Sequence, residues 1–132
     1  MSAPLYGLLY RSRATRGLLA ADLSDILTSA VEHNEARDVT GLLVYGEMAM
    51  LPGIPGLFVQ WLEGAEADVR EVYGRIQDDP RHTDIELVAE GPQGDLTGEN
   101  TRLFPAWGMA LRRLADVPAT LPGFLVYARQ NS

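Results

Sequence analysis

The stretch "LFVQWLEG", residues 57–64, has the pattern of a buried central strand with one polar residue inside it. Side chains alternate between the two faces of a strand, so Gln60 shares its face with Phe58 and Leu62. An amide in a dry interior needs hydrogen-bond partners, because each unpaired group costs about 1–3 kcal/mol. The stretch therefore predicts a core strand and a specific partner for Gln60.

Composition sets the class of protein. With 132 residues, of which 46% are hydrophobic, the chain is long enough for one domain with a substantial core. The formal net charge of −7 argues against nucleic acid and anionic membrane surfaces as partners. No run of 18 apolar residues occurs, so no transmembrane helix is expected. In "MSAPLYGLLYRSRATR" the charges follow the apolar stretch, the reverse of a secretory signal, so we expect a cytoplasmic location.

Thiol and metal chemistry are both disfavoured. The sequence has no cysteine, which excludes disulfides, thiolate metal sites and cysteine nucleophiles. Its two histidines, His33 and His82, are too few for a histidine-rich metal site. We expect no metal.

Periodicity predicts an α+β fold. Alternating apolar residues predict strands at 5–12, 39–46, 57–62, 84–90 and 107–113, and stripes spaced three and four apart predict helices at 20–35 and 67–79. "GPQGDLTGENTRLFP", residues 91–105, has the composition of a polar loop. The order βαββαββ predicts a ferredoxin-like sandwich with two helices on one face of a five-stranded sheet. We assign residues 1–115 to this domain and 116–132 to a short extension that packs on the sheet or at an interface.

Polar residues converge in the predicted interior. The first and third strands are central neighbours in this fold, so Tyr10 and Gln60 would lie side by side, facing the helices. Asn34 continues the apolar stripe of the first helix toward the same place, although a helix-capping role would explain it equally well. The three groups either satisfy one another or suit a flat heteroaromatic ligand with carbonyl and imide edges.

Several motifs together resemble those of BLUF domains, the blue-light sensors that use FAD. They are "LLYRSRAT", "HNEARDVTGLLVY", "FVQWLEG", "YGRIQDDPRHTDIEL" and "FPAWGM", and the resemblance covers about residues 4–112. It implies a ferredoxin-like sandwich that holds the isoalloxazine ring between its two helices. It also implies FAD as the cofactor, with FMN or riboflavin as alternatives.

The resemblance also implies residue roles. Tyr10 matches the photoactive tyrosine and Gln60 the switching glutamine, while Trp107 and Met109 match fifth-strand residues near that glutamine. The residues expected to bind the cofactor are Tyr10, His33, Asn34, Gln60, Arg75, Ile76 and Asp79. Without a flavin, the simplest interpretation of Arg75 and Asp79 is an i,i+4 salt bridge on a helix, and that of Ile76 is a core residue.

The implied function is that of a sensor and not of an enzyme. Light would drive electron and proton transfer from Tyr10 and rearrange the hydrogen bonds of Gln60, giving a red-shifted signalling state. The main alternative is a flavin-free ferredoxin-like module that acts by oligomerisation or protein binding. A small acid-anhydride hydrolase would need a phosphate-cradling loop, and "YRSRATRG" supplies arginines but no glycine-rich cradle.

Two apolar segments point to contact surfaces. "EMAMLPGIPG", residues 47–56, and the segment 117–127 are too apolar for free loops. We expect the first to act as a lid over the flavin or as an interface, and the second to cover the other sheet face. With no effector domain expected after residue 132, the signal would pass to an unidentified downstream protein or through a homo-oligomer, most simply a dimer.

Overall fold

The computed structural model describes residues 4–14, 38–47, 56–78, 82–104, 107–113 and 120–131. Eight elements are described, in this order: β1 Tyr6–Ala14, β2 Thr40–Glu47, β3 Leu57–Gly64, α2 Glu66–Gln77, β4 His82–Pro92, α3 Gln93–Thr97, β5 Trp107–Arg113 and α4 Leu121–Asn131. The helix predicted at 20–35 and most of the segment 47–56 lie outside the described residues. Within the described ranges, no helix is long and apolar enough to cross a membrane.

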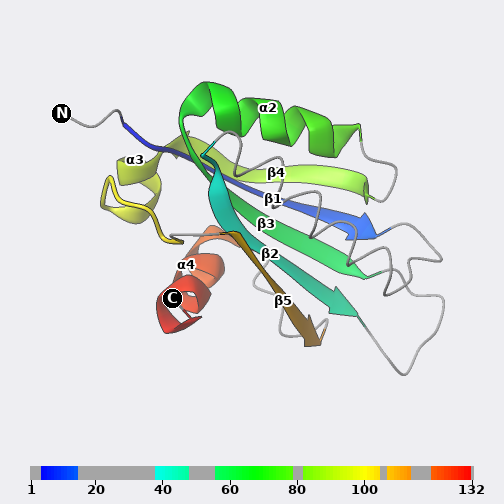
Figure 1. The fold of residues 1–132 in the computed structure, drawn as a ribbon. Coiled ribbons are helices and arrows are strands. Elements are labelled where there is room, and N and C mark those ends of the chain that lie inside the picture. Colours follow the sequence, from blue (N-terminus) through cyan, green and yellow to red (C-terminus); the bar gives the residue numbers. More distant parts are fainter. Residues whose placement is uncertain are drawn as a thin grey trace.

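The sheet has the strand order β4-β1-β3-β2-β5, with β1 and β3 in the interior of the sheet (Figure 1). Strands β1, β2, β3 and β4 pair antiparallel, and β5 runs parallel to β2. The α+β class and the ferredoxin-like arrangement are confirmed, as is the predicted pairing of the first and third strands.

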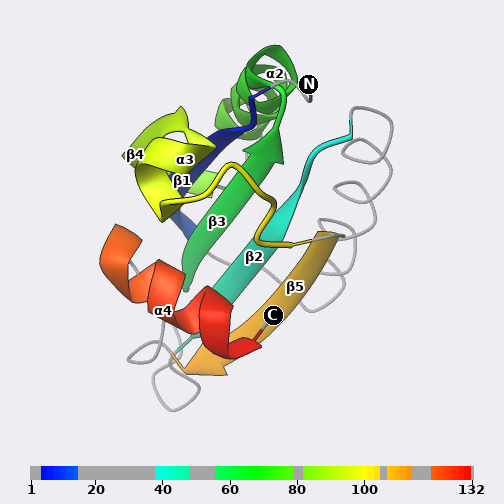
Figure 2. The ribbon, with the colours of Figure 1, turned by 90° about the vertical axis from the view of Figure 1, so that its left-hand side faces the viewer.

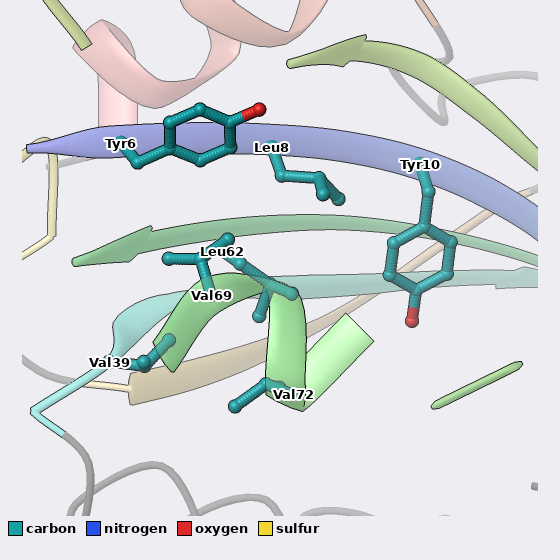
Figure 3. Packing of buried hydrophobic residues seen from close by; sticks show 7 residues of the cluster. All are labelled: Tyr6, Leu8, Tyr10, Val39, Leu62, Val69 and Val72. Carbon is teal, nitrogen blue, oxygen red and sulfur yellow. The ribbon is translucent and has the colours of Figure 1, made fainter. Parts of the chain in front are cut away.

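Helix α2 covers one face of the sheet. Val69 and Val72 are its buried residues, and Tyr73 and Ile76 pack beside them against the same core cluster, as their spacing predicts. The sheet contributes Tyr6, Leu8 and Tyr10, which follow one another along β1 in Figure 3. Burying each valine side chain contributes about 1.5–3 kcal/mol, which fixes α2 over β1 and β3.

Helix α4 covers the opposite face, and Figure 2 shows it on the far side of the strands from α2. Phe124 and Ala128 of α4 are buried against Leu9, Val59 and Trp61. Phe124 stacks on Trp61 with ring centroids 5.9 Å apart, and it meets the edge of Phe104 at 6.2 Å. The sheet therefore has a core on each side.

The segment between β4 and β5 differs from its prediction as a polar loop. It begins with the short helix α3, which is followed by Gly98, whose φ of 89° is a left-handed conformation that glycine adopts readily. Gln93, the first residue of α3, is fully buried. The loop prediction was wrong here because Pro92, Gly94 and Gly98 lie at the start, inside and just past the end of a helix too short to show periodicity.

Candidate functional site

Gln60 lies at the centre of the sheet, on the face that α2 covers. Its Cα partners are Tyr10 on β1 and Leu43 on β2. These pairs belong to one row of residues across the sheet, in which Tyr10 pairs with Leu87 on β4 and Leu43 pairs with Met109 on β5. Gln60 is only 4% exposed, so its amide is held in an interior of low polarity.

Tyr10 is the partner that the sequence predicted for Gln60. The Tyr10 hydroxyl donates a hydrogen bond to Oε1 of Gln60, and Tyr10 is completely buried. Direct pairing in the antiparallel ladder puts the two side chains on one face and within reach of each other. A phenol bonded to an amide oxygen in a dry site has a defined path for its proton.

Among the described residues, the bond from Tyr10 is the one side-chain hydrogen bond of Gln60, which leaves the donors at the nitrogen end of its amide without a described acceptor. Gln60 is only 4% exposed, so these donors favour a further polar partner beside it. A flavin fits this requirement, because its ring carries carbonyl and nitrogen acceptors on an otherwise flat surface. The residues present therefore fit the cofactor.

Helix α2 supplies aromatic and aliphatic neighbours. The Tyr73 ring lies 5.5 Å from that of Tyr10, with an angle of 43° between the planes. Burial raises the pKa of Tyr73, and the charge of Glu90 adds to this effect, so its phenol stays neutral at neutral pH. Ile76 is half-buried and packs on the Tyr10 cluster, consistent with a residue that flanks a ring.

Other predicted residues are placed less completely. Arg75 is exposed and forms an ion pair with Glu71, one turn earlier, at 3.7 Å. His33, Asn34 and Asp79 lie outside the described residues. For β5 the structure describes the strand but not the side chains: Met109 falls in the row of Gln60, and Trp107 is two residues earlier, opposite Gly41.

The sequence reasoning missed a polar cluster on the other face of β3. Glu63 is fully buried, and so is Gln93, which donates to Oε1 of Glu63 at 2.8 Å. The alternation of β3 gave a usable signal, because Glu63 continues the face of Val59 and Trp61. Nothing in the sequence around Gln93 indicates its burial.

Comparison with known proteins identifies the family. The family model described as "Sensors of blue-light using FAD" (BLUF) matches residues 5–110. The photoactivated adenylate cyclase subunit beta of Euglena gracilis is 35% identical over 115 residues, covering 87% of this chain and 12% of that protein. The chain thus spans about one eighth of the length of this relative.

Solved structures agree with this assignment. The dark-state structure of BlrB, described as a BLUF protein, matches with a TM-score of 0.67 and 28% identity over 94% of this chain and 83% of that one. The structure of BlrP1 from Klebsiella pneumoniae with FMN and cyclic di-GMP matches with a TM-score of 0.65 and 26% identity, over 96% of this chain and 30% of that one. The chain therefore belongs to the BLUF family of flavin-binding blue-light sensors.

Proposed function

We propose that the Tyr10–Gln60 pair is the light-responsive centre of this sensor and that a flavin binds non-covalently beside it, on the face of the sheet that α2 covers. The observation that supports this proposal most directly is the buried hydrogen bond from the Tyr10 hydroxyl to Oε1 of Gln60. In that arrangement the amide nitrogen of Gln60 is left to donate to the cofactor.

When bound and excited by blue light, the flavin supplies a strong one-electron oxidant. Tyr10 would give an electron to the flavin, and its phenolic proton would pass along the hydrogen bond to Gln60 and through the amide to a ring nitrogen of the flavin. The Gln60 side chain then rearranges, and on return of the electron and proton it keeps a new hydrogen-bond pattern with Tyr10. Because the amide donates only through its nitrogen, this rearrangement changes how strongly the amide donates to a carbonyl of the cofactor.

Burial makes the pair suitable for this role. Tyr10 and Gln60 are 0% and 4% exposed, so bulk water does not compete for their hydrogen bonds. In a medium of low polarity each hydrogen bond is electrostatically stronger, so changing from one arrangement of the amide to the other requires breaking strong bonds. Close packing by Tyr73 and Ile76 restricts the space in which the side chains can move.

We further propose FAD as the flavin, with FMN and riboflavin as the alternatives to be separated by experiment. The chain carries 18 acidic and 11 basic residues, so a diphosphate requires local cations. Arg75, exposed at the end of α2, is the described residue that we assign to the tail. His33, Asn34 and Asp79 complete the proposed binding set.

The protein itself acts as a sensor module and not as an enzyme in this proposal. The named relatives include adenylate cyclase subunits, but the chemistry proposed here is light-driven and reversible, with no substrate consumed. A downstream protein or a second copy of the chain would receive the signal.

Flavin content and photochemistry test the proposal together. Protein refolded or expressed with FAD should be yellow, with one flavin per chain, and the flavin released by denaturation is identified by chromatography. Blue light should shift the absorption to longer wavelength, reversibly in the dark. A colourless protein that takes up no flavin, or one whose spectrum does not respond to light, would refute the proposal.

A further inference from the structure

The carboxylate of Glu63 is buried and makes an unusually large number of hydrogen bonds. Its Oε1 accepts from the Trp61 indole at 2.9 Å, from the Gln93 amide at 2.8 Å and from the Leu103 backbone N–H at 2.9 Å. Its Oε2 accepts from the Phe104 backbone N–H at 2.7 Å and from the Thr40 hydroxyl at 3.3 Å. Such charge-assisted bonds offset the cost of burying the charge, and they fix the positions of all five donors.

The donors lie on segments that are distant in the sequence. Leu103 and Phe104 belong to the connection that leads into β5, whose first residue is Trp107. Thr40 begins β2, and Gln93 begins α3. Glu63 therefore joins β3 to the start of β2, to α3 and to the entry of β5.

Arg102 closes this cluster on its outer side. Its guanidinium donates to the Thr40 hydroxyl at 2.7 Å and to the Glu63 backbone carbonyl at 3.3 Å. It also forms an ion pair with Asp38 at 3.1 Å. The connection before β5 is thus held to β2 and β3 at consecutive residues, 102, 103 and 104.

The same cluster reaches helix α4. Among the described residues, the two rings outside α4 that contact Phe124 are those of Trp61 and Phe104, and both residues donate a hydrogen bond to the Glu63 carboxylate. A change in the position of either ring would alter the packing around Phe124. Glu63 consequently links β3 to the entry of β5, the edge strand of the sheet, and to α4 on the face opposite α2.

We propose that Glu63 is a positioning residue of the light response, which carries a change at Gln60 through β3 to the entry of β5 and to α4. Gln60 and Glu63 are three residues apart on one strand, about 10 Å along its axis, and point to opposite faces. A paired central strand moves as a unit, so a shift of β3 that follows the Gln60 rearrangement also moves the carboxylate. The five donors then follow it. This inference rests on the proposed function of Gln60.

Nuclear magnetic resonance of the full, ¹⁵N-labelled chain with bound FAD tests this directly. In the wild type, light should shift the signals of the Leu103 and Phe104 amides and of the Trp61 indole N–H. In Glu63→Gln the red shift of the flavin should persist, but the light-induced shifts at Leu103 and Phe104 should be lost. The matched control is Glu86→Gln, which neutralises an exposed carboxylate on β4 and should respond like the wild type.

A milder variant keeps the test valid if Glu63→Gln does not fold. Thr40→Val removes the longest of the five hydrogen bonds to the Glu63 carboxylate. That bond is made to Oε2, the oxygen that also accepts from the Phe104 N–H. The light-induced shift at Phe104 should change, and that at Leu103, which bonds to Oε1, should be retained.

Two results would overturn the inference: a red-shifted wild type with no change at Leu103 and Phe104, or undiminished changes there in Glu63→Gln. A wild type that shows no red shift would instead refute the proposed function.

Discussion

Truncation of Phe124 to alanine should destabilise the fold without removing the flavin. Phe124 is completely buried and contacts the rings of Trp61, Phe104 and Tyr127. Phe→Ala changes in cores cost about 3–5 kcal/mol through lost burial and the cavity that remains. Because α4 lies near the end of the described chain and can partly close the cavity, we expect about 3 kcal/mol, a large share of the ~5–15 kcal/mol typical of a domain. The melting temperature should fall by about 10 °C.

The assay is urea and thermal unfolding followed by circular dichroism, with flavin content measured at a temperature where the variant is folded. Val126→Ala is the matched control on the same helix, because Val126 is 54% exposed and its truncation should change stability by no more than about 0.5 kcal/mol. Flavin content should be unchanged in both variants, since Phe124 and Gln60 belong to opposite faces of the sheet. A loss below about 1 kcal/mol in Phe124→Ala would mean that α4 does not cover the sheet in solution.

Three further substitutions are informative. Gln60→Leu should keep the flavin but abolish the light-induced red shift, because the ring stays covered while the rearranging amide is gone; a normal red shift would remove Gln60 from the mechanism. Tyr10→Phe should also lose the red shift, because the variant has neither the oxidisable phenol nor its proton; absorption spectra before and after illumination decide this. Gly7→Ala should cost about 1–3 kcal/mol, because a Cβ there would lie 2.6 Å from Gln93 Oε1 and 2.7 Å from the Trp61 ring. Gly94→Ala, whose Cβ would meet nothing closer than 3.9 Å, is its control, and equal unfolding midpoints for the two would contradict the packing described.

The centre of the fold could be predicted from sequence because it depends on local alternation. The pattern of 57–62 defined which residues of β3 face α2, and the topology then paired Gln60 with Tyr10. The first step uses only periodicity, and the second uses the strand neighbours of the ferredoxin-like arrangement that the order βαββαββ predicts. Helix α2 followed in the same way from its apolar spacing.

The alternation of β3 indicates which face Glu63 occupies, but its hydrogen-bond partners could not be predicted from sequence, because they come from far along the chain. A carboxylate before a glycine at the end of a strand is ordinarily exposed to solvent. Its burial here depends on the Leu103 and Phe104 amides, 40 and 41 residues later. Only the folded connection before β5 brings these donors to β3.

Helix α4 was expected only as an apolar contact segment. Pro122 and Gly123 in its first turn disfavour a helix on propensity, although proline is tolerated near a helix N-terminus. The burial of Phe124 and Ala128, one turn apart, shows what stabilises it. The expectation of a homo-oligomer stays a prediction, which light scattering of the flavin-loaded chain can test.

The central claim is that light changes the hydrogen bonding of the Gln60 amide, and infrared spectroscopy of the flavin-loaded chain measures this most directly. In the light-minus-dark difference spectrum, we predict that a flavin carbonyl band moves to lower frequency in the wild type, because a carbonyl bond weakens when it accepts a stronger hydrogen bond. The band should stay unmoved in Gln60→Leu. A carbonyl band that does not move in the wild type, or that moves equally in both proteins, would contradict the account.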